Sequence, residues 1–127
     1  MDRQDWTTFE RLFTENAVLD YSAFGGPCCA ARDMASYLDN SISQMRGTQH
    51  TISTSMLDVE GNTATAHTAA QVMMISGKDD GTSHVLFIGL WYRDTLVKRP
   101  DGWRIQTRSQ EQSWIHNMPL GRDLLKS

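Results

Sequence analysis

The side chains that could perform acid–base chemistry in this chain include His50 and His67, Tyr21, and an acid near the start, Asp2. An imidazole held by a carboxylate is a base that works near neutral pH. A phenol can donate a hydrogen bond to a developing enolate oxygen. Proton abstraction next to a carbonyl would need no cofactor and no metal. These residue types therefore point to proton transfer on an organic molecule.

Each of these residues also has a purely structural interpretation. Asp2 could be a solvated acid at a frayed terminus, and His50 could be a strand histidine with a hydrogen bond in the core. Tyr21 could be a core tyrosine whose hydroxyl lies at the rim. His67 fits a plain sheet position, but it would touch a ligand if its face of the strand is concave. Alternation places on that face Thr65, Ala69, Gln71 and Met73.

The N-terminal part of the chain predicts two helices and a strand. Apolar residues recur at helical spacing over residues 6–13, and the period then changes to that of a strand over 17–21. After the break at Gly25, Gly26 and Pro27, Asp33 can cap a second helix that ends at Gly47. The expected inward face of this helix consists of Met34, Tyr37, Leu38, Ile42 and Met45.

From His50 onward the pattern is that of strands. It predicts a hairpin of residues 51–59 and 63–75, then strands over 83–94 and 103–111. In the last strand, Arg108 and Gln110 could line the cone or face water, and the second interpretation is preferred. Two helices followed by consecutive strands predict an α+β domain in which a curved antiparallel sheet packs on helices. The concave side of such a sheet leaves a pocket, which is the default ligand site.

Composition limits the class of protein. With 127 residues the chain predicts one domain, 1–127, and its net charge of −3 makes nucleic acid an unfavourable partner. No apolar run is long enough to span a membrane, and the start lacks the pattern of a secretory signal, so we expect a cytoplasmic protein. The adjacent Cys28 and Cys29 are interpreted as reduced loop residues without metal-binding or redox spacing.

Three segments together resemble the SnoaL-like domains of the NTF2-related superfamily. DRQDWTTFERLFTENAVLDY resembles the family's opening signature, D-x-x-D-W-x-x-L-x-x-L-F-x-x-x-A-x-x-D-Y. GTQHTIST followed by DVEGNTATAHT resembles the family's T-x-H strand and the hairpin after it, and WYRDTLVKRPDGWRIQTR resembles its paired C-terminal strands. The resemblance extends from residue 2 to about residue 114 and implies a cone-shaped α+β fold around a central pocket.

The resemblance also implies roles for individual residues. Scytalone dehydratase-like, bile-acid dehydratase-like and dehydrochlorinase-like enzymes use a histidine base oriented by an aspartate. These positions match His50 and Asp2. The tyrosine of the D-Y motif, which holds a substrate oxygen in scytalone dehydratase, matches Tyr21.

The chain departs from the family pattern at several positions. Met73 is expected to stand where scytalone dehydratase has a second histidine, with His67 six residues earlier, while Leu86 and Ile88 replace a polar pair. These changes predict a more apolar pocket and a larger or more apolar substrate, with Met73, Leu86, Ile88 and His67 as binding residues. The family's long helix ahead of the catalytic aspartate is expected to be missing or shortened.

Two classes of function follow. The first is a cofactor-independent dehydratase acting on a hydroxylated polyketide, terpenoid or steroid-like molecule, with an isomerase or cyclase using the same base as its nearest alternative. The second is a non-catalytic ligand-binding or oligomerisation module. Trp91 and Tyr92, if exposed on an open sheet, predict coverage by self-association into a trimer or dimer.

Overall fold

The computed structural model describes residues 5–77 and 80–117. Its helical segments are α1 (Trp6–Arg11), the short 3-10 helix η1 (Ser22–Phe24) and α2 (Ala31–Ser43). Its strands are β1 (Phe13–Asp20), β2 (Cys28–Ala30), β3 (Gly47–Glu60), β4 (Thr63–Gly77), β5 (Ser83–Arg99) and β6 (Gly102–His116). The order of helices and long strands agrees with the prediction. Cys28 and Cys29, expected in a loop, lie in β2 and form no disulfide.

Both helices form because one side of each can be buried. In α2, Met34, Leu38 and Ile42 recur every four residues and are buried against the sheet. Tyr37, predicted to share this face, is exposed. The predicted cap, Asp33, lies instead in the first turn, and the N-cap position is Ala30 without a side-chain hydrogen bond.

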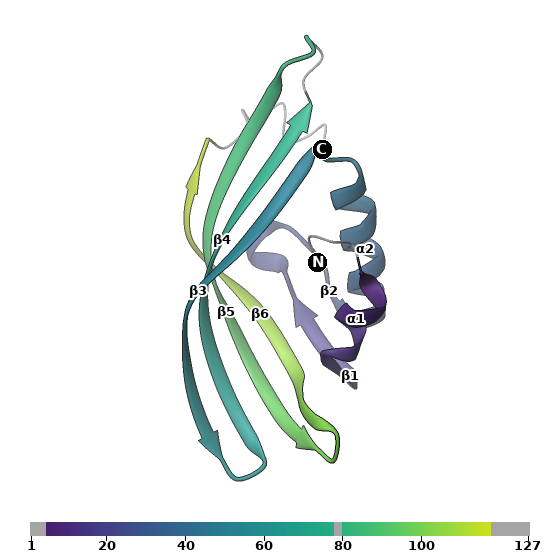
Figure 1. Cartoon of the computed structure of the whole chain (residues 1–127), viewed down its shortest axis with the longest axis vertical. Coiled ribbons are helices and arrows are strands. Elements are labelled where there is room, and N and C mark those ends of the chain that lie inside the picture. The colour runs from purple at the N-terminus through teal and green to yellow at the C-terminus, as the bar shows by residue number, and fades with distance from the viewer. Residues whose placement is uncertain (1–4, 78–79, 118–127) are drawn as a thin grey trace.

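Six strands form one curved sheet in the order β2-β1-β6-β5-β4-β3. All neighbouring strands are antiparallel except β1 and β6, which are parallel. Both α-helices lie on the same side of the sheet, the side toward which it curves (Figure 1). We call this side the inner face and the opposite side the outer face. The α+β architecture with a curved sheet is thus confirmed.

The register assigns every strand residue to one face. Val72 pairs with Ile88, and Ala70 pairs with Leu90, and these four buried side chains belong to the core with the helices. Side chains of directly paired residues share a face, and neighbours along a strand alternate. The inner face is therefore defined by this core, and residues one position away, such as Trp91 and Gly89, belong to the outer face.

Gly89 provides a test of this packing on the outer face. Gly89 pairs with Trp114, and a Cβ atom added at Gly89 would overlap the Trp114 ring. We expect Gly89→Ala to displace the ring and to lower the free energy of unfolding by about 1–3 kcal/mol, as overpacking typically does. Denaturant unfolding measures this change. In a Trp114→Ala background the added methyl group meets no ring, so an equal cost in both backgrounds would contradict the packing.

Candidate functional site

Tyr21 is positioned by the turn that follows β1. Its backbone N–H donates to the carbonyl of Pro27 at 3.0 Å, and its carbonyl accepts from Gly26 at 3.0 Å. Gly25 makes the turn possible with a φ of 81°, a conformation that favours glycine. The turn directs the Tyr21 ring into the core, where the side chain is 4% exposed. The structural alternative for Tyr21, a core tyrosine with its hydroxyl at the rim, therefore holds for the ring but not for the hydroxyl, which is buried.

The hydroxyl of Tyr21 is buried and has no hydrogen-bond partner among the residues that the structure describes. Burial, and then the neighbouring phenol of Tyr92, raise the pKa of Tyr21 above its ordinary value, and the charge of Arg108 opposes this only in part. The phenol therefore stays protonated at every physiological pH. It can act as a hydrogen-bond donor, but not as a base.

A buried ion pair lies beside Tyr21. The Nε and Nη2 atoms of Arg108 donate to the two carboxylate oxygens of Asp94 at 2.8 and 2.9 Å. The guanidinium also lies over the ring of Tyr92, with 4.4 Å between its central carbon and the ring centroid. Burial disfavours the charge of Arg108, but the hydrogen bonds that it donates to Asp94 and the negative charge of that carboxylate keep the pKa of the guanidinium above its usual value. Arg108 thus stays cationic.

Arg108 and Tyr92 correct two expectations from the sequence. Arg108 was expected to face water, and Tyr92 was expected to lie with Trp91 on a sheet face that self-association covers, but Arg108 and Tyr92 both belong to the inner face. The strict alternation of β6 fails because the register shifts between the pairs Thr95–Thr107 and Leu96–Ile105. This bulge places Ile105 and Arg108 on the same face despite their odd and even numbers. Tyr92 cannot share a face with its neighbour Trp91.

His50 lies on β3 and is half-buried. It pairs with Val72, which pairs in turn with Ile88, so its imidazole belongs to the inner face. Leu86 also belongs to that face, because it lies two residues from Ile88 and packs against the core. The structure therefore places His50, Tyr21, Leu86 and Ile88 on one side of the sheet. Asp2, the predicted partner of His50, lies outside the described residues.

His67 and Met73 lie on the outer face and are separated from the other predicted site residues by the sheet. His67 pairs with Met56 and Arg93, and its ring packs on Trp91 with 4.3 Å between the ring centroids. Its Nε2 atom is 3.6 Å from Glu111 Oε2, which also accepts a hydrogen bond from Arg93 Nε at 2.6 Å. Met73 therefore does not stand in the place of an inner-face histidine. Its neighbour Val72 faces that side.

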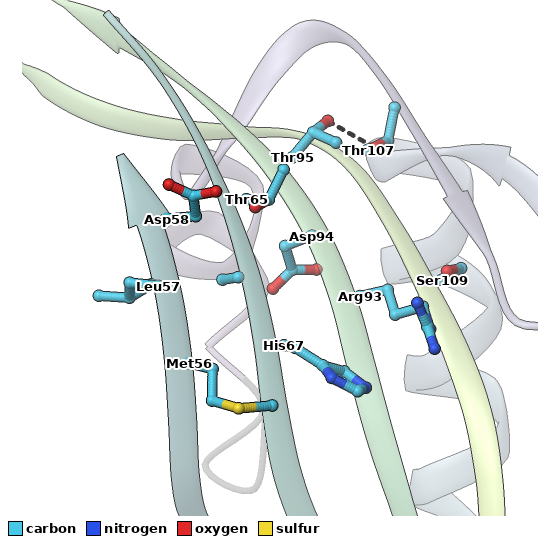
Figure 2. Close-up of a pocket in the computed structure, with 11 residues that line it drawn as sticks. Met56, Leu57, Asp58, Thr65, His67, Arg93, Asp94, Thr95, Thr107 and Ser109 are labelled. Atoms are coloured by element: carbon cyan, nitrogen blue, oxygen red, sulfur yellow. Dashed lines mark hydrogen bonds between the residues drawn. The ribbon is translucent and has the colours of Figure 1, made fainter. Parts of the chain in front are cut away.

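The outer face carries a hollow of about 550 Å³. Figure 2 shows that Met56 and His67 lie side by side at one end and that Thr95 and Thr107 are hydrogen-bonded at the other. The hollow is lined by Met56, Leu57, Asp58, Thr65, Ala66, His67, Arg93, Asp94, Thr95, Thr107 and Ser109.

The part of the chain that the structure describes contains neither a metal-binding cluster nor a membrane-spanning helix. No group of three or more His, Cys, Asp or Glu side chains is arranged to bind a metal ion there. Neither α-helix in residues 5–77 and 80–117 has the length and apolar character needed to cross a bilayer.

Comparison with known proteins gives a consistent result. The sequence model of the SnoaL-like domain matches residues 1–109. An uncharacterised protein of Mycobacterium tuberculosis is 32% identical over 108 residues, which cover 85% of this chain and 72% of the relative. An uncharacterised protein of Mycobacterium bovis matches with the same identity and coverage.

Solved structures with low sequence identity share the fold. The Kfla4162 protein of Kribbella flavida has a TM-score of 0.80 and 22% identity, covering 91% of this chain and 82% of that protein. A candidate scytalone dehydratase of Novosphingobium aromaticivorans has a TM-score of 0.78 and 20% identity. The match covers 95% of this chain and 83% of that protein. The hexachlorocyclohexane dehydrochlorinase LinA type 2 has a TM-score of 0.76 and 11% identity. The match covers 94% of this chain and 79% of that protein.

Proposed function

The chain belongs to the SnoaL-like domain family, and from this premise we propose that it is a cofactor-independent lyase of the dehydratase type. In this proposal His50 is the base, Asp2 orients its imidazole, and Tyr21 donates a hydrogen bond to a substrate oxygen. The substrate class is a hydroxylated, largely apolar molecule such as a polyketide, terpenoid or steroid-like ketone.

The proposed reaction is a β-elimination. An imidazole nitrogen of His50 takes the proton on the carbon next to the substrate carbonyl, and the electron pair moves toward the carbonyl oxygen. The Tyr21 hydroxyl stabilises the resulting enolate by hydrogen bonding. The enolate then re-forms the carbonyl, expels the β-hydroxyl group and leaves a carbon–carbon double bond. The imidazolium returns its proton to the departing oxygen, so that water is released and the enzyme is restored.

The observation that carries this proposal is that His50 and Tyr21, distant in sequence, both belong to the inner face of the sheet. The face between them is apolar, because Val72, Ile88 and Leu90 are buried there. Val72, which pairs with His50, belongs to this apolar core, so apolar surface adjoins the proposed base. Since the Tyr21 hydroxyl is buried, its contact with a substrate oxygen requires neighbouring side chains to move aside.

The apolar lining supports the substrate class. Leu86 and Ile88 add hydrocarbon surface on the side of His50, and Arg108 is already neutralised by Asp94. A strongly charged substrate would lose its hydration here without gaining a free counter-ion. A mostly hydrocarbon molecule with one or two oxygens matches this face better.

The proposed dyad can be tested before a substrate is known. The Asp2 carboxylate, if it lies beside the imidazole, favours the protonated ring. We therefore expect the NMR titration midpoint of the His50 ring to move to lower pH in Asp2→Asn than in the wild-type protein. Asp5→Asn serves as the control, because Asp5 caps α1 through Thr8 and carries the same charge near the same end of the chain.

Coincident His50 titrations in the wild-type and Asp2→Asn proteins would remove the dyad from the proposal. The inner face would then fit the second class of function better, a small-molecule-binding module without turnover. Equilibrium binding of the same ligand by wild type and His50→Ala, with no conversion of that ligand, is the signature of this class. An isomerase or cyclase would retain the dyad and differ only in its product.

The location of the protein in the cytoplasm and its self-association remain proposals of the same kind. Neither is needed for the reaction at His50.

A further inference from the structure

The outer face carries three interacting side chains that the proposed reaction does not use. His67 and Arg93 pair on the neighbouring strands β4 and β5 (Figure 2), and Glu111 reaches them from β6. The Oε2 atom of Glu111 accepts a hydrogen bond from Arg93 Nε at 2.6 Å, and the same atom is 3.6 Å from His67 Nε2. One carboxylate oxygen therefore lies between two groups that can both be cations.

We propose that His67 is a pH-sensitive switch on the outer face. When its imidazole is protonated, His67 takes the carboxylate of Glu111, and the guanidinium of Arg93 is released toward the hollow. The switch does not depend on the reaction at the inner face, because the sheet separates His67 from His50 and Tyr21.

Neutral His67 has a nitrogen that lacks a hydrogen bond. Within residues 5–77 and 80–117, its Nε2 atom is buried from solvent and has no hydrogen-bond partner. At 3.6 Å the carboxylate of Glu111 is too far for a hydrogen bond but close enough to attract an imidazolium. A buried polar atom without a partner costs free energy, and a charge-assisted hydrogen bond to Glu111 would recover it. Protonation therefore gives Nε2 the partner that it lacks.

Trp91 holds the imidazole ring in this position. The ring of His67 packs on the indole with 4.3 Å between the centroids and 36° between the planes. The face of an indole attracts a cation, so the same contact favours the protonated ring. The imidazole therefore stays beside Glu111 when its charge changes.

Arg93 and His67 differ in their access to water, which decides which of them keeps the carboxylate. The side chain of Arg93 is 60% exposed, whereas that of His67 is 29% exposed. A guanidinium that leaves Glu111 regains its hydration, but an imidazolium with a buried nitrogen does not. The exchange thus leaves the exposed cation in water and pairs the buried one.

The other groups that face His67 do not oppose its protonation. Met56, its partner on β3, is uncharged, and Asp58 adds a negative charge to the lining of the same hollow. Asp94 also contributes to this lining, but its charge is neutralised by Arg108 on the inner face. The remaining charges are those of the exchange itself.

Glu111 stays charged while His67 titrates. The hydrogen bond from Arg93 is the main cause that lowers the pKa of Glu111, and the neighbouring imidazole lowers it further. Histidines titrate at higher pH than such a carboxyl group. The exchange therefore follows the proton on His67 and not a proton on Glu111.

The exchange changes the charge that the hollow presents. Before it, the guanidinium of Arg93 is neutralised by Glu111. After it, the free guanidinium lies next to Ser109, its partner on β6, and both can donate hydrogen bonds to an anionic group of a ligand. The hollow of about 550 Å³ is thus better suited to anionic groups in the acidic form.

The wild-type protein provides the first test. We expect the NMR signal of the Arg93 Nε–H group to shift between pH 8 and pH 5 with the same midpoint as the ring proton of His67. In His67→Gln the Arg93 signal should stay constant over this range. An Arg93 signal that does not follow His67 in the wild type, or that shifts equally in His67→Gln, would overturn the proposal.

Two variants should move the His67 titration in opposite directions. Glu111→Gln removes the partner of the imidazolium and should shift the midpoint to lower pH, whereas Arg93→Gln removes a competing cation and should shift it to higher pH. His116 is the control, because its partner Phe87 is six residues from Arg93 along β5, about 20 Å away and beyond the screening length at physiological salt. Its titration should be unchanged in both variants.

Two results of this titration would contradict the switch. Coincident His67 midpoints in the wild type and Glu111→Gln would mean that the carboxylate does not pair with the imidazolium. An unchanged or lower midpoint in Arg93→Gln would mean that the two cations do not compete. If either variant does not fold by circular dichroism, the comparison of the Arg93 and His67 signals in the wild type decides the question alone.

Discussion

Replacing His50 with glutamine is expected to lower kcat at least about 100-fold, because a positioned general base contributes factors of this size or larger. Glutamine keeps the length and polarity of the side chain but cannot accept the substrate proton. The measurement is the appearance of enone absorbance from a cyclic β-hydroxyketone that the wild type dehydrates. Deuterium uptake at the carbon next to the carbonyl, followed by NMR in D₂O, reports proton abstraction even where no leaving group departs.

The matched control for His50 is His116→Gln. His116 is an exposed imidazole near the end of β6, and it pairs with Phe87 on the outer face. Its replacement changes the same functional group outside the proposed site, so kcat should stay within about twofold of wild type. The base assignment would fail if His50→Gln retained wild-type kcat and deuterium uptake. A loss confined to KM, with kcat unchanged, would instead assign His50 to binding.

Removing the carboxylate of Asp94 should produce the largest loss of stability. Asp94→Ala leaves the buried guanidinium of Arg108 without its partner, and breaking such a pair costs about 3–5 kcal/mol of unfolding free energy. The side chains of Asp94 and Arg108 are only 6% and 17% exposed, so water cannot replace the lost carboxylate. Urea unfolding monitored by circular dichroism measures the change.

Asp101 offers a matched control for Asp94. Its carboxylate accepts from Arg104 at 2.8 Å, the same distance as in the buried pair, but Asp101 is 73% exposed. Asp101→Ala should therefore cost less than about 1 kcal/mol. Equal losses for Asp94→Ala and Asp101→Ala would mean that burial does not decide the strength of these pairs. A double variant, Asp94→Leu with Arg108→Met, should recover most of the stability, since an apolar pair avoids the buried charge.

The sequence predicted the features of the fold that depend on local pattern. The helical spacing around Met34, Leu38 and Ile42, the turn at Gly61 and the long hairpin of β3 and β4 are all present. Such features can be predicted because periodicity and turn residues act over a few positions. The same reasoning placed His50 in a strand and Tyr21 at the end of one. It could not state where either side chain points.

The sequence did not predict on which face of the sheet His67 and Met73 lie, and this has one physical cause. The alternation of β4 correctly grouped His67 with Met73, but a strand pattern does not reveal which of its two faces meets the helices. That choice depends on the residues that pair across the sheet and on where α1 and α2 dock. His67 and Met73 consequently lie behind the sheet rather than in the proposed site.

Arg108 shows that a single β-bulge can make the alternation pattern of a strand predict the wrong face for a residue. The run Arg104, Gln106, Arg108 and Gln110 suggests one polar face, but the bulge in β6 turns Arg108 into the core. The only signal in the sequence was an aspartate on the preceding strand, Asp94, which could have been considered as a partner. A bulge depends on the pairing of two whole strands, so local alternation does not reveal it.

Amino-acid order alone was enough to establish the family, the α+β class and the residues capable of acid–base chemistry, because these follow from local periodicity and from motifs in a fixed succession. Tertiary structure decided which of those residues share a surface. Tyr21 and His50 lie on the inner face, whereas His67 and Met73 lie on the outer face. Arg108 is buried against Asp94. Those relations depend on strand register, bulges and helix docking, which bring together residues far apart along the chain.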